Sequence, residues 1–169
     1  MSQLVALSVS IGVLGGIATF LFLNSGLLIW AAFVAWACFF HSGGDTNGLR
    51  NTIVGNVFGA FCAWVAAVIL LSVPLGDTLG LPLWAAIVVG VTVLGMCLAA
   101  HIKAFSVIPA SVYGYASTFA FLLQTAGMLN KDKLMSASLQ NGLVVVALSM
   151  VIGALFGFAS GKVGALLAK

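Results

Sequence analysis

The chain has 169 residues, of which 63% are hydrophobic and 5% are charged, and its mean hydropathy is +1.26. Soluble domains carry about a quarter charged residues, so this composition excludes an ordinary soluble fold and indicates an integral membrane protein. The net charge of +3 comes from residues in or beside expected loops, which excludes a basic surface for nucleic acid.

Six apolar segments predict an all-α, polytopic membrane helix bundle that forms one domain over residues 1–169. The first, residues 3–23, is long enough to cross about 30 Å of hydrocarbon and lacks the basic start and cleavage site of a signal peptide. The second, residues 27–40, follows a turn of three residues and is short for a complete span. The other segments are residues 51–73, 83–100, 106–125 and 136–158.

Glycines recur at helical spacing in three of these segments and predict faces where two helix backbones come close. They are Gly12 and Gly16 in the first segment, Gly55 and Gly59 in the third, and Gly153, Gly157 and Gly161 in the last. Six short helices make a thin bundle, so we also expect a homo-oligomer.

The distribution of basic residues predicts that both termini lie in the cytoplasm. With six spans, the side of the termini receives Arg50, Lys103, Lys162 and Lys169, and the opposite side receives Lys131 and Lys133. Trp36 and Trp64 lie deeper in their segments, so each indole N–H is expected to have a hydrogen-bond partner.

Short matches between segments indicate an internal repeat in one of two registers. Residues 26–34 resemble residues 80–88, residues 54–59 resemble residues 152–157, and residues 13–15 resemble residues 93–95. The first match relates the second segment to the fourth as a parallel repeat. The other two predict inverted three-helix units, residues 1–73 and 83–161, a symmetry found in many transporters. At most one of the two registers can be ancestral. Apolar segments also match by chance.

Hydroxyl side chains follow one face of the segment from residue 106 to residue 125. Ser111, Tyr115 and Thr118 are spaced i, i+4, i+7, so they share one face of a helix. In hydrocarbon each hydroxyl needs a partner, so this face must contact another helix, water or a solute. With the amides of Asn56 and Asn141, these residues are candidates to line a path for a solute. The alternative is helix packing through interhelical hydrogen bonds.

The ionisable residues argue against catalysis and against proton coupling. Asp45, Asp77 and Asp132 occupy separate loops, so no pair of carboxylates can act as acid and base. No segment carries a charged residue in its middle, where proton relays are built. His41, Asp45 and His101 fall on the cytoplasmic side and are candidates for a proton-sensitive gate, with solvated interfacial positions as the alternative. No metal-ligand spacing is present, so we expect no enzyme, metal site or cofactor.

Three stretches of sequence resemble a known family. Residues 26–33 read GLLIWAAF, residues 152–157 read IGALFG, and FSVIP at residues 105–109 is followed by Tyr113-Gly114 and by TFA at residues 118–120. With this spacing of apolar segments, the chain resembles the YcdZ-like family of bacterial inner-membrane proteins of unknown function. The resemblance implies a compact multi-pass protein of the bacterial inner membrane, and it implies no catalytic or binding residues.

A face of uncharged polar groups without buried charges predicts a passive channel or facilitator for a small, uncharged polar solute. The alternative is a membrane scaffold or accessory subunit that transports nothing, which the glycine faces favour. The expected partners are membrane lipid, further copies of the chain and a small neutral solute.

Overall fold

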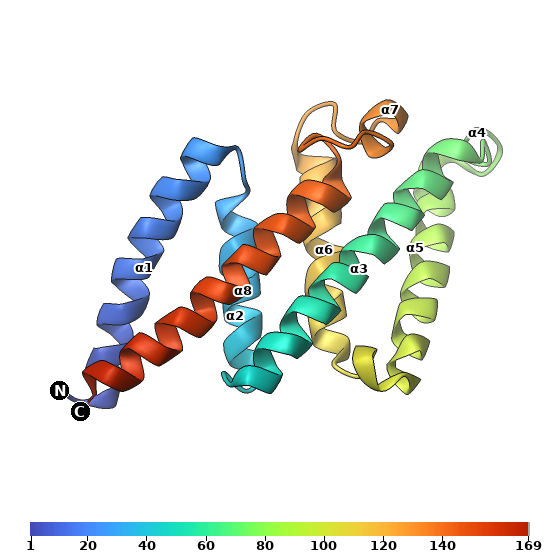
Figure 1. Cartoon of the computed structure of the whole chain (residues 1–169). Coiled ribbons are helices and arrows are strands. Elements are labelled where there is room, and N and C mark those ends of the chain that lie inside the picture. The colour runs from blue at the N-terminus through green and yellow to red at the C-terminus, as the bar shows by residue number, and fades with distance from the viewer. Residues whose placement is uncertain (169) are drawn as a thin grey trace.

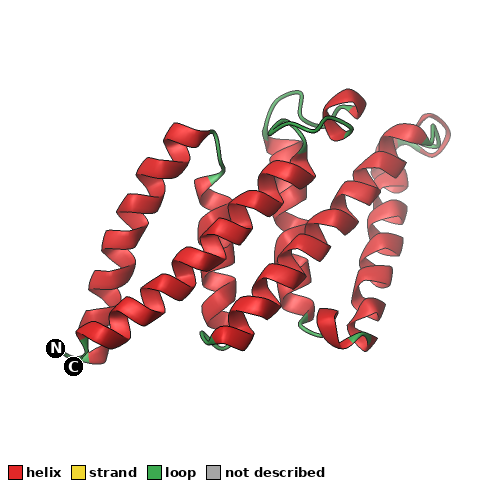
Figure 2. Ribbon diagram, viewed as in Figure 1, coloured by secondary structure: helices red, strands yellow, loops and turns green. Residues whose placement is uncertain are grey.

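The structure, a computed structural model, describes residues 1–168 as helices joined by short connections (Figures 1 and 2). Six helices have 13 residues or more: α1 (Gln3–Ser25), α2 (Ile29–His41), α3 (Thr46–Ser72), α5 (Leu81–Leu98), α6 (Ile108–Gln124) and α8 (Gly142–Leu167). The short helices are α4 (Gly76–Leu79), η1 (Ala99–His101), η2 (Lys103–Phe105) and α7 (Lys131–Leu134). Helices contain 82% of the residues, and no strand occurs in the described part of the chain. This confirms the all-α prediction.

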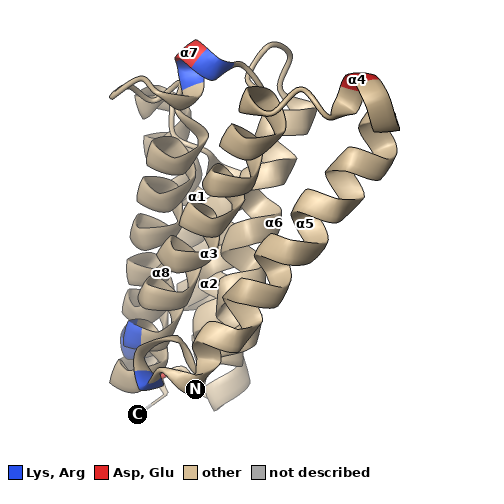
Figure 3. Ribbon diagram, turned by 90° about the vertical axis from the view of Figure 1, so that its right-hand side faces the viewer, with Lys and Arg blue, Asp and Glu red and all other residues tan. Residues whose placement is uncertain are grey.

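Successive long helices run in opposite directions between two ends of the bundle (Figure 1). One end holds both ends of the chain, the α2–α3 turn, η1 and η2, and we call it the terminal end. The opposite end holds α4 and α7. Charged residues lie toward these two ends (Figure 3), so the middle of the bundle is uncharged.

Four helical stretches are long and apolar enough to cross a membrane, namely α1, α3, α8 and the continuous stretch formed by α5 and η1. The 13 residues of α2 and the 17 residues of α6 are shorter. At 1.5 Å per residue they extend over about 20 and 25 Å, less than the 30 Å of a typical hydrocarbon core. Six complete spans therefore remain a prediction for α2 and α6.

The outer surface of the bundle is strongly apolar. Leu4, Phe20 and Leu23 on α1 are 77%, 69% and 70% exposed, and Val91 on α5 is 65% exposed. Water does not favour a continuous apolar surface of this kind, whereas lipid chains do. The fold therefore has the outside expected of a bundle that lies in hydrocarbon.

Two helix boundaries differ from the sequence prediction because polar residues cap the helices. The third apolar segment begins at residue 51, but α3 begins at Thr46, where Asp45 Oδ1 accepts a hydrogen bond of 2.7 Å from Gly48 N. The last helix begins at Gly142 instead of Ser136, because Asn141 Oδ1 accepts a hydrogen bond from the second residue of α8.

The two longest helices, α3 and α8, hold the bundle together. They pack against each other, with α2 and α6 behind them and α1 and α5 at the outer edges (Figure 1). Helix α3 also packs on α5 and α6, and helix α8 also packs on α1 and α2. Every other long helix therefore contacts α3 or α8.

Backbone contact joins α3 to α6. A Cβ atom built on Gly55 or Gly59 of α3 would overlap α6, where Gly59 meets the carbonyl oxygen of Ser111. In return, a Cβ atom on Gly114 of α6 would overlap the carbonyl oxygen of Asn56. Glycine on both helices is what allows the two backbones to touch.

The glycines of α8 make a similar contact with α2. A Cβ atom built on Gly153 would overlap the backbone of Ala32, and one built on Gly157 would lie 3.1 Å from the ring of Phe39. At Gly161 the distance to Phe39 is 3.8 Å, which is an ordinary contact. The glycines predicted in α3 and α8 thus lie at helix interfaces, with the closest approach at the first of the three in α8.

The glycine pair of α1 has a different position. A Cβ atom built on Gly12 or Gly16 would have no neighbour within 4 Å, so these two glycines make no close packing within one chain. The small residue at the contact of α1 with α8 belongs to α8 instead. A Cβ atom on Gly164 would lie 3.2 Å from Leu7.

Ser160 is the centre of a buried hydrogen-bond network that joins α1, α2 and α8. Trp36 Nε1 donates to Ser160 Oγ at 3.0 Å, Ser160 Oγ donates to the carbonyl oxygen of Gly157 at 2.7 Å, and Ser10 Oγ donates to the carbonyl oxygen of Ser160 at 2.8 Å. The other deep indole, Trp64, donates to a carbonyl oxygen at 2.8 Å. Both deep tryptophans therefore have the partners expected of them.

We expect Gly114→Ala to lower the free energy of unfolding by about 1–3 kcal/mol, because the new Cβ atom would overlap the backbone of α3. Thermal unfolding of the purified protein in detergent measures the effect. The matched control is Gly16→Ala, which meets no neighbour and should leave stability unchanged or raise it by up to about 1 kcal/mol. Equal melting temperatures for the two variants would contradict the backbone contact.

Ser160→Ala should destabilise the protein by about 1–3 kcal/mol, because the buried N–H of Trp36 loses its acceptor. The control Ser8→Ala removes an exposed hydroxyl that bonds within its own helix, and it should change stability by no more than about 0.5 kcal/mol. The same thermal unfolding assay compares them. If Ser160→Ala melted like Ser8→Ala, the network would not contribute to stability.

Candidate functional site

Three buried polar side chains gather where α3 crosses α6. Thr52 and Asn56 are one helical turn apart on α3, so they lie on the same face of that helix. Ser111 comes from the part of α6 that touches the glycines of α3. Thr52 and Asn56 are 0% exposed and Ser111 is 2% exposed. We call these three residues the crossing site.

Four polar atoms of the crossing site have no hydrogen-bond partner within ordinary bonding distance, although the hydroxyl group of Thr52 faces the thiol of Cys38 on α2. The atoms are Thr52 Oγ1, Asn56 Oδ1, Asn56 Nδ2 and Ser111 Oγ. Within the described chain, the one other buried side-chain atom of this kind is Trp84 Nε1. A buried donor or acceptor without a partner costs about 1–3 kcal/mol, so four in one place are not expected from packing alone.

The depth of the crossing site follows from its position in α3. Asn56 lies ten residues after Thr46, where the helix begins. This places it about 15 Å along the helix axis, near half the thickness of a hydrocarbon core. Glycine on both helices allows the backbones to approach here, which shields the amide from the outside.

The other members of the hydroxyl face of α6 have partners. Tyr115 Oη lies 2.9 Å from Thr92 Oγ1 of α5, and Thr118 Oγ1 donates to the carbonyl oxygen of Gly114 at 3.0 Å. Like Ser111, both side chains are buried, so α6 turns this face toward its neighbours. The structure therefore brings Ser111 and Asn56 to one helix crossing, and it directs Tyr115 toward α5.

Asn141 lies apart from the crossing site, at the start of α8. Its Nδ2 atom donates to the carbonyl oxygens of Leu134 and Ser136, both at 2.9 Å, and its Oδ1 atom accepts from the backbone of Leu143. All of these contacts are local. Asn141 caps α8 and shapes the α7–α8 connection, and its role in lining a path together with Asn56 stays a prediction.

The three gate candidates share the terminal end, but no hydrogen bond joins them within residues 1–168. His41 Nδ1 lies 3.2 Å from Tyr113 Oη. Asp45 caps α3, and His101 lies exposed in η1, between α5 and η2. A proton-sensitive gate formed by the three residues stays a prediction.

Thr52 belongs to the crossing site, and its i, i+4 relation to Asn56 is the sequence signal that indicates it. Apolar length alone predicts that the helix begins at residue 51, so this signal lies at the edge of the predicted segment, next to the polar α2–α3 turn.

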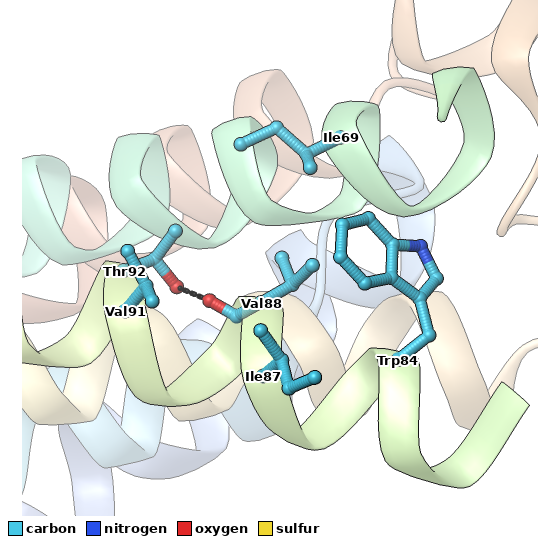
Figure 4. A pocket seen from close by; sticks show the side chains of 6 residues that line it. All are labelled: Ile69, Trp84, Ile87, Val88, Val91 and Thr92. Carbon is cyan, nitrogen blue, oxygen red and sulfur yellow. Dashed lines mark hydrogen bonds between the residues drawn. The ribbon is translucent and has the colours of Figure 1, made fainter. Parts of the chain in front are cut away.

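The pockets between α5 and its neighbours are apolar. Figure 4 shows one of about 140 Å³, in which the hydroxyl group of Thr92 bonds back to the carbonyl oxygen of Val88 in its own helix. It is lined by Ile69, Trp84, Ile87, Val88, Val91 and Thr92. A pocket of about 350 Å³ beside Tyr115 is also bordered mainly by aliphatic and aromatic side chains. Neither pocket provides a set of polar groups for a polar solute.

The described residues include no group of three or more His, Cys, Asp or Glu side chains that could hold a metal ion.

The profile of a family described as "Protein of unknown function (DUF1097)" matches residues 8–165, from α1 to α8. No curated protein and no solved structure matches the chain. Because the match covers most of its length, the chain belongs to the DUF1097 family of proteins of unknown function.

Proposed function

We propose that the protein is a passive facilitator that lets a small, uncharged polar solute cross a membrane, with the crossing site as its binding station. The observation that carries the proposal is the set of four partnerless polar atoms on Thr52, Asn56 and Ser111. Groups buried in hydrocarbon need hydrogen-bond partners. A small solute that passes the site, or water, would supply them.

The chemistry of the crossing site favours an uncharged solute. The amide offers a donor and an acceptor, and each hydroxyl group can act as either. Every buried polar side chain in the described part of the chain is uncharged: Ser10, Thr52, Asn56, Ser111, Ser117, Thr118, Asn141, Ser149 and Ser160. Ion pathways and proton relays usually place ionisable groups at this depth.

The tight contact of α3 with α6 favours a facilitator that changes its conformation during transport. An open pore is less consistent with this contact. The glycine contacts leave no space between the two backbones at the crossing, so a solute would pass only when these helices separate. Rocking or gating of one part of a helix bundle against the other is the usual means of alternating access. A slow, saturable flux is therefore expected.

We also propose that the two halves of the chain form an inverted repeat of three plus three helices. Two equivalent contacts join the halves: Gly55 of α3 in the first half meets Ala110 of α6 in the second, and Gly153 of α8 in the second half meets Ala32 of α2 in the first. The short helices α2 and α6 then occupy corresponding positions. Short segments at matching positions of two halves are typical of transporter binding sites.

The cellular setting that we propose is the bacterial inner membrane, with both termini in the cytoplasm. Support comes from the resemblance to the YcdZ-like family and from the basic residues at the terminal end, which include Arg50, Lys103 and Lys162. Assembly into a homo-oligomer stays a prediction.

The second candidate function is a scaffold or accessory subunit that transports nothing and acts without catalysis. The glycine contacts that close the crossing favour it, because they give a rigid and tightly packed core. In that case the partnerless polar atoms would have no role in flux.

Flux through liposomes tests the proposal. Purified protein in liposomes should raise permeability to water, glycerol or urea above that of protein-free liposomes, as measured by light scattering after an osmotic step. The flux added by the double variant Thr52→Val/Ser111→Ala should be about tenfold lower than the flux added by the wild type. This factor corresponds to about 1.4 kcal/mol. The melting temperature of the variant should stay equal or rise, because two partnerless groups are removed.

The control is the double variant Thr19→Val/Ser8→Ala, which removes the same groups from α1, where each hydroxyl bonds within its own helix. It should keep the wild-type flux. Wild-type protein that is silent toward all three solutes would contradict transport. Undiminished flux in the Thr52→Val/Ser111→Ala variant would contradict the site.

A further inference from the structure

A polar cavity of about 360 Å³ lies at the terminal end, between the start of α3 and the connection from η2 to α6. It is lined by Asn47, Arg50, Asn51, Lys103, Ala104 and Ser106. It is separate from the crossing site, with which it shares no residue. Two cations and two amides around one cavity indicate a site for an anion.

The sequence brings these side chains together through two local features. Asn47, Arg50 and Asn51 are spaced i, i+3, i+4 in the first turns of α3, so they share one face of the helix. The ring of Phe105 stacks on the ring of Phe58 of α3, with centroids 4.1 Å apart and planes at 21°. This stack fixes η2 against α3, and Lys103 of η2 lines the cavity together with Arg50.

The local charge favours an anion. Arg50 and Lys103 are exposed at the cavity, and Asp45 is the one acidic residue at the terminal end. Its Oδ1 atom is already used to cap α3. The other acids, Asp77 and Asp132, lie in α4 and α7 at the opposite end (Figure 3). The positive end of the α3 dipole adds to the attraction.

We propose that this cavity binds a phosphate group, carried by an anionic phospholipid or free in solution. Arginine presents a planar fork of donors that matches phosphate oxygens, and lysine adds a point charge. The amides of Asn47 and Asn51 supply further donors. Together these groups offer more donors than a bound carboxylate would use, which favours phosphate. Ser106 Oγ donates to the carbonyl oxygen of Lys103 at 3.0 Å, so it shapes the cavity wall.

The surroundings of the cavity place the phosphate at the boundary between water and hydrocarbon. Ile102 and Ile108, which flank Lys103 and Ser106 in the chain, are 57% and 38% exposed. Basic pockets between helices near such a boundary suit lipid headgroups, because acyl chains can extend along the adjoining apolar surface.

Ligand-dependent thermal stability of the purified protein in an uncharged detergent tests the proposal. The probes are dioctanoyl phosphatidylglycerol, dioctanoyl phosphatidylcholine and inorganic phosphate. Phosphatidylglycerol should raise the melting temperature of the wild type more than phosphatidylcholine does. In the double variant Arg50→Gln/Lys103→Gln, the concentration needed for the half-maximal shift should rise at least about tenfold. The matched control, Lys131→Gln/Lys133→Gln, removes two charges at the opposite end and should behave like the wild type.

The probes also identify the source of the phosphate. A shift with inorganic phosphate that depends on Arg50 and Lys103 would assign the site to a free phosphate, and a shift with phosphatidylglycerol alone would assign it to a headgroup. Equal shifts with phosphatidylcholine, equal loss in both double variants, or no shift of the wild type with either anionic probe would overturn the proposal. Without probe, Arg50→Gln/Lys103→Gln should melt like the wild type, because both side chains are exposed.

Discussion

The backbone contact between α3 and α6 determines how the polar groups of the crossing site are buried. Glycines at positions 55, 59 and 114 remove the side chains that would hold the two helices apart. Because the backbones touch, Asn56 and Ser111 are shielded from the outside at a depth where water does not reach them easily. The same contact turns the hydroxyl face of α6 away from lipid. The candidate site therefore follows from helix packing, and any change in that packing would alter the site.

The buried and half-buried hydroxyl groups of the bundle fall into three classes, and the classes have different meanings. Some, such as Thr118, donate a hydrogen bond to a carbonyl oxygen of their own helix and need no partner from another helix. Others, such as Ser10 and Ser160, join separate helices and so stabilise the tertiary structure. Ser111 does neither, and the hydroxyl group of Thr52 lies beside the thiol of Cys38 without a partner at ordinary bonding distance. A sequence pattern shows where hydroxyl groups share a face, but the third class becomes visible only when every partner is counted.

Much of the fold follows from the sequence, because it depends on local signals. Apolar length identifies four helices, and helical spacing of glycine identifies the faces of α3 and α8 that pack closely. The inward orientation of Ser111, Tyr115 and Thr118 follows from the cost of hydroxyl groups in lipid. The role of Asn141 and the pairing of Tyr115 with α5 could not be predicted, since they depend on which elements meet in space. Gly12 and Gly16 show the same limit, because a small residue indicates a close approach only when a neighbour lies opposite it.

The outer position of α5 ties the bundle to the properties of its solvent. Only Trp84, Val88 and Met96 of its 18 residues are buried, and among the long helices it packs mainly on α3. In a bilayer, acyl chains would provide most of its neighbours, so bilayer thickness would influence its tilt more than that of α3 or α8. Thr92 of α5 also lies 2.9 Å from Tyr115 of α6, and the two helices share one apolar cluster, so a change in the tilt of α5 would also reach the α6 side of the bundle.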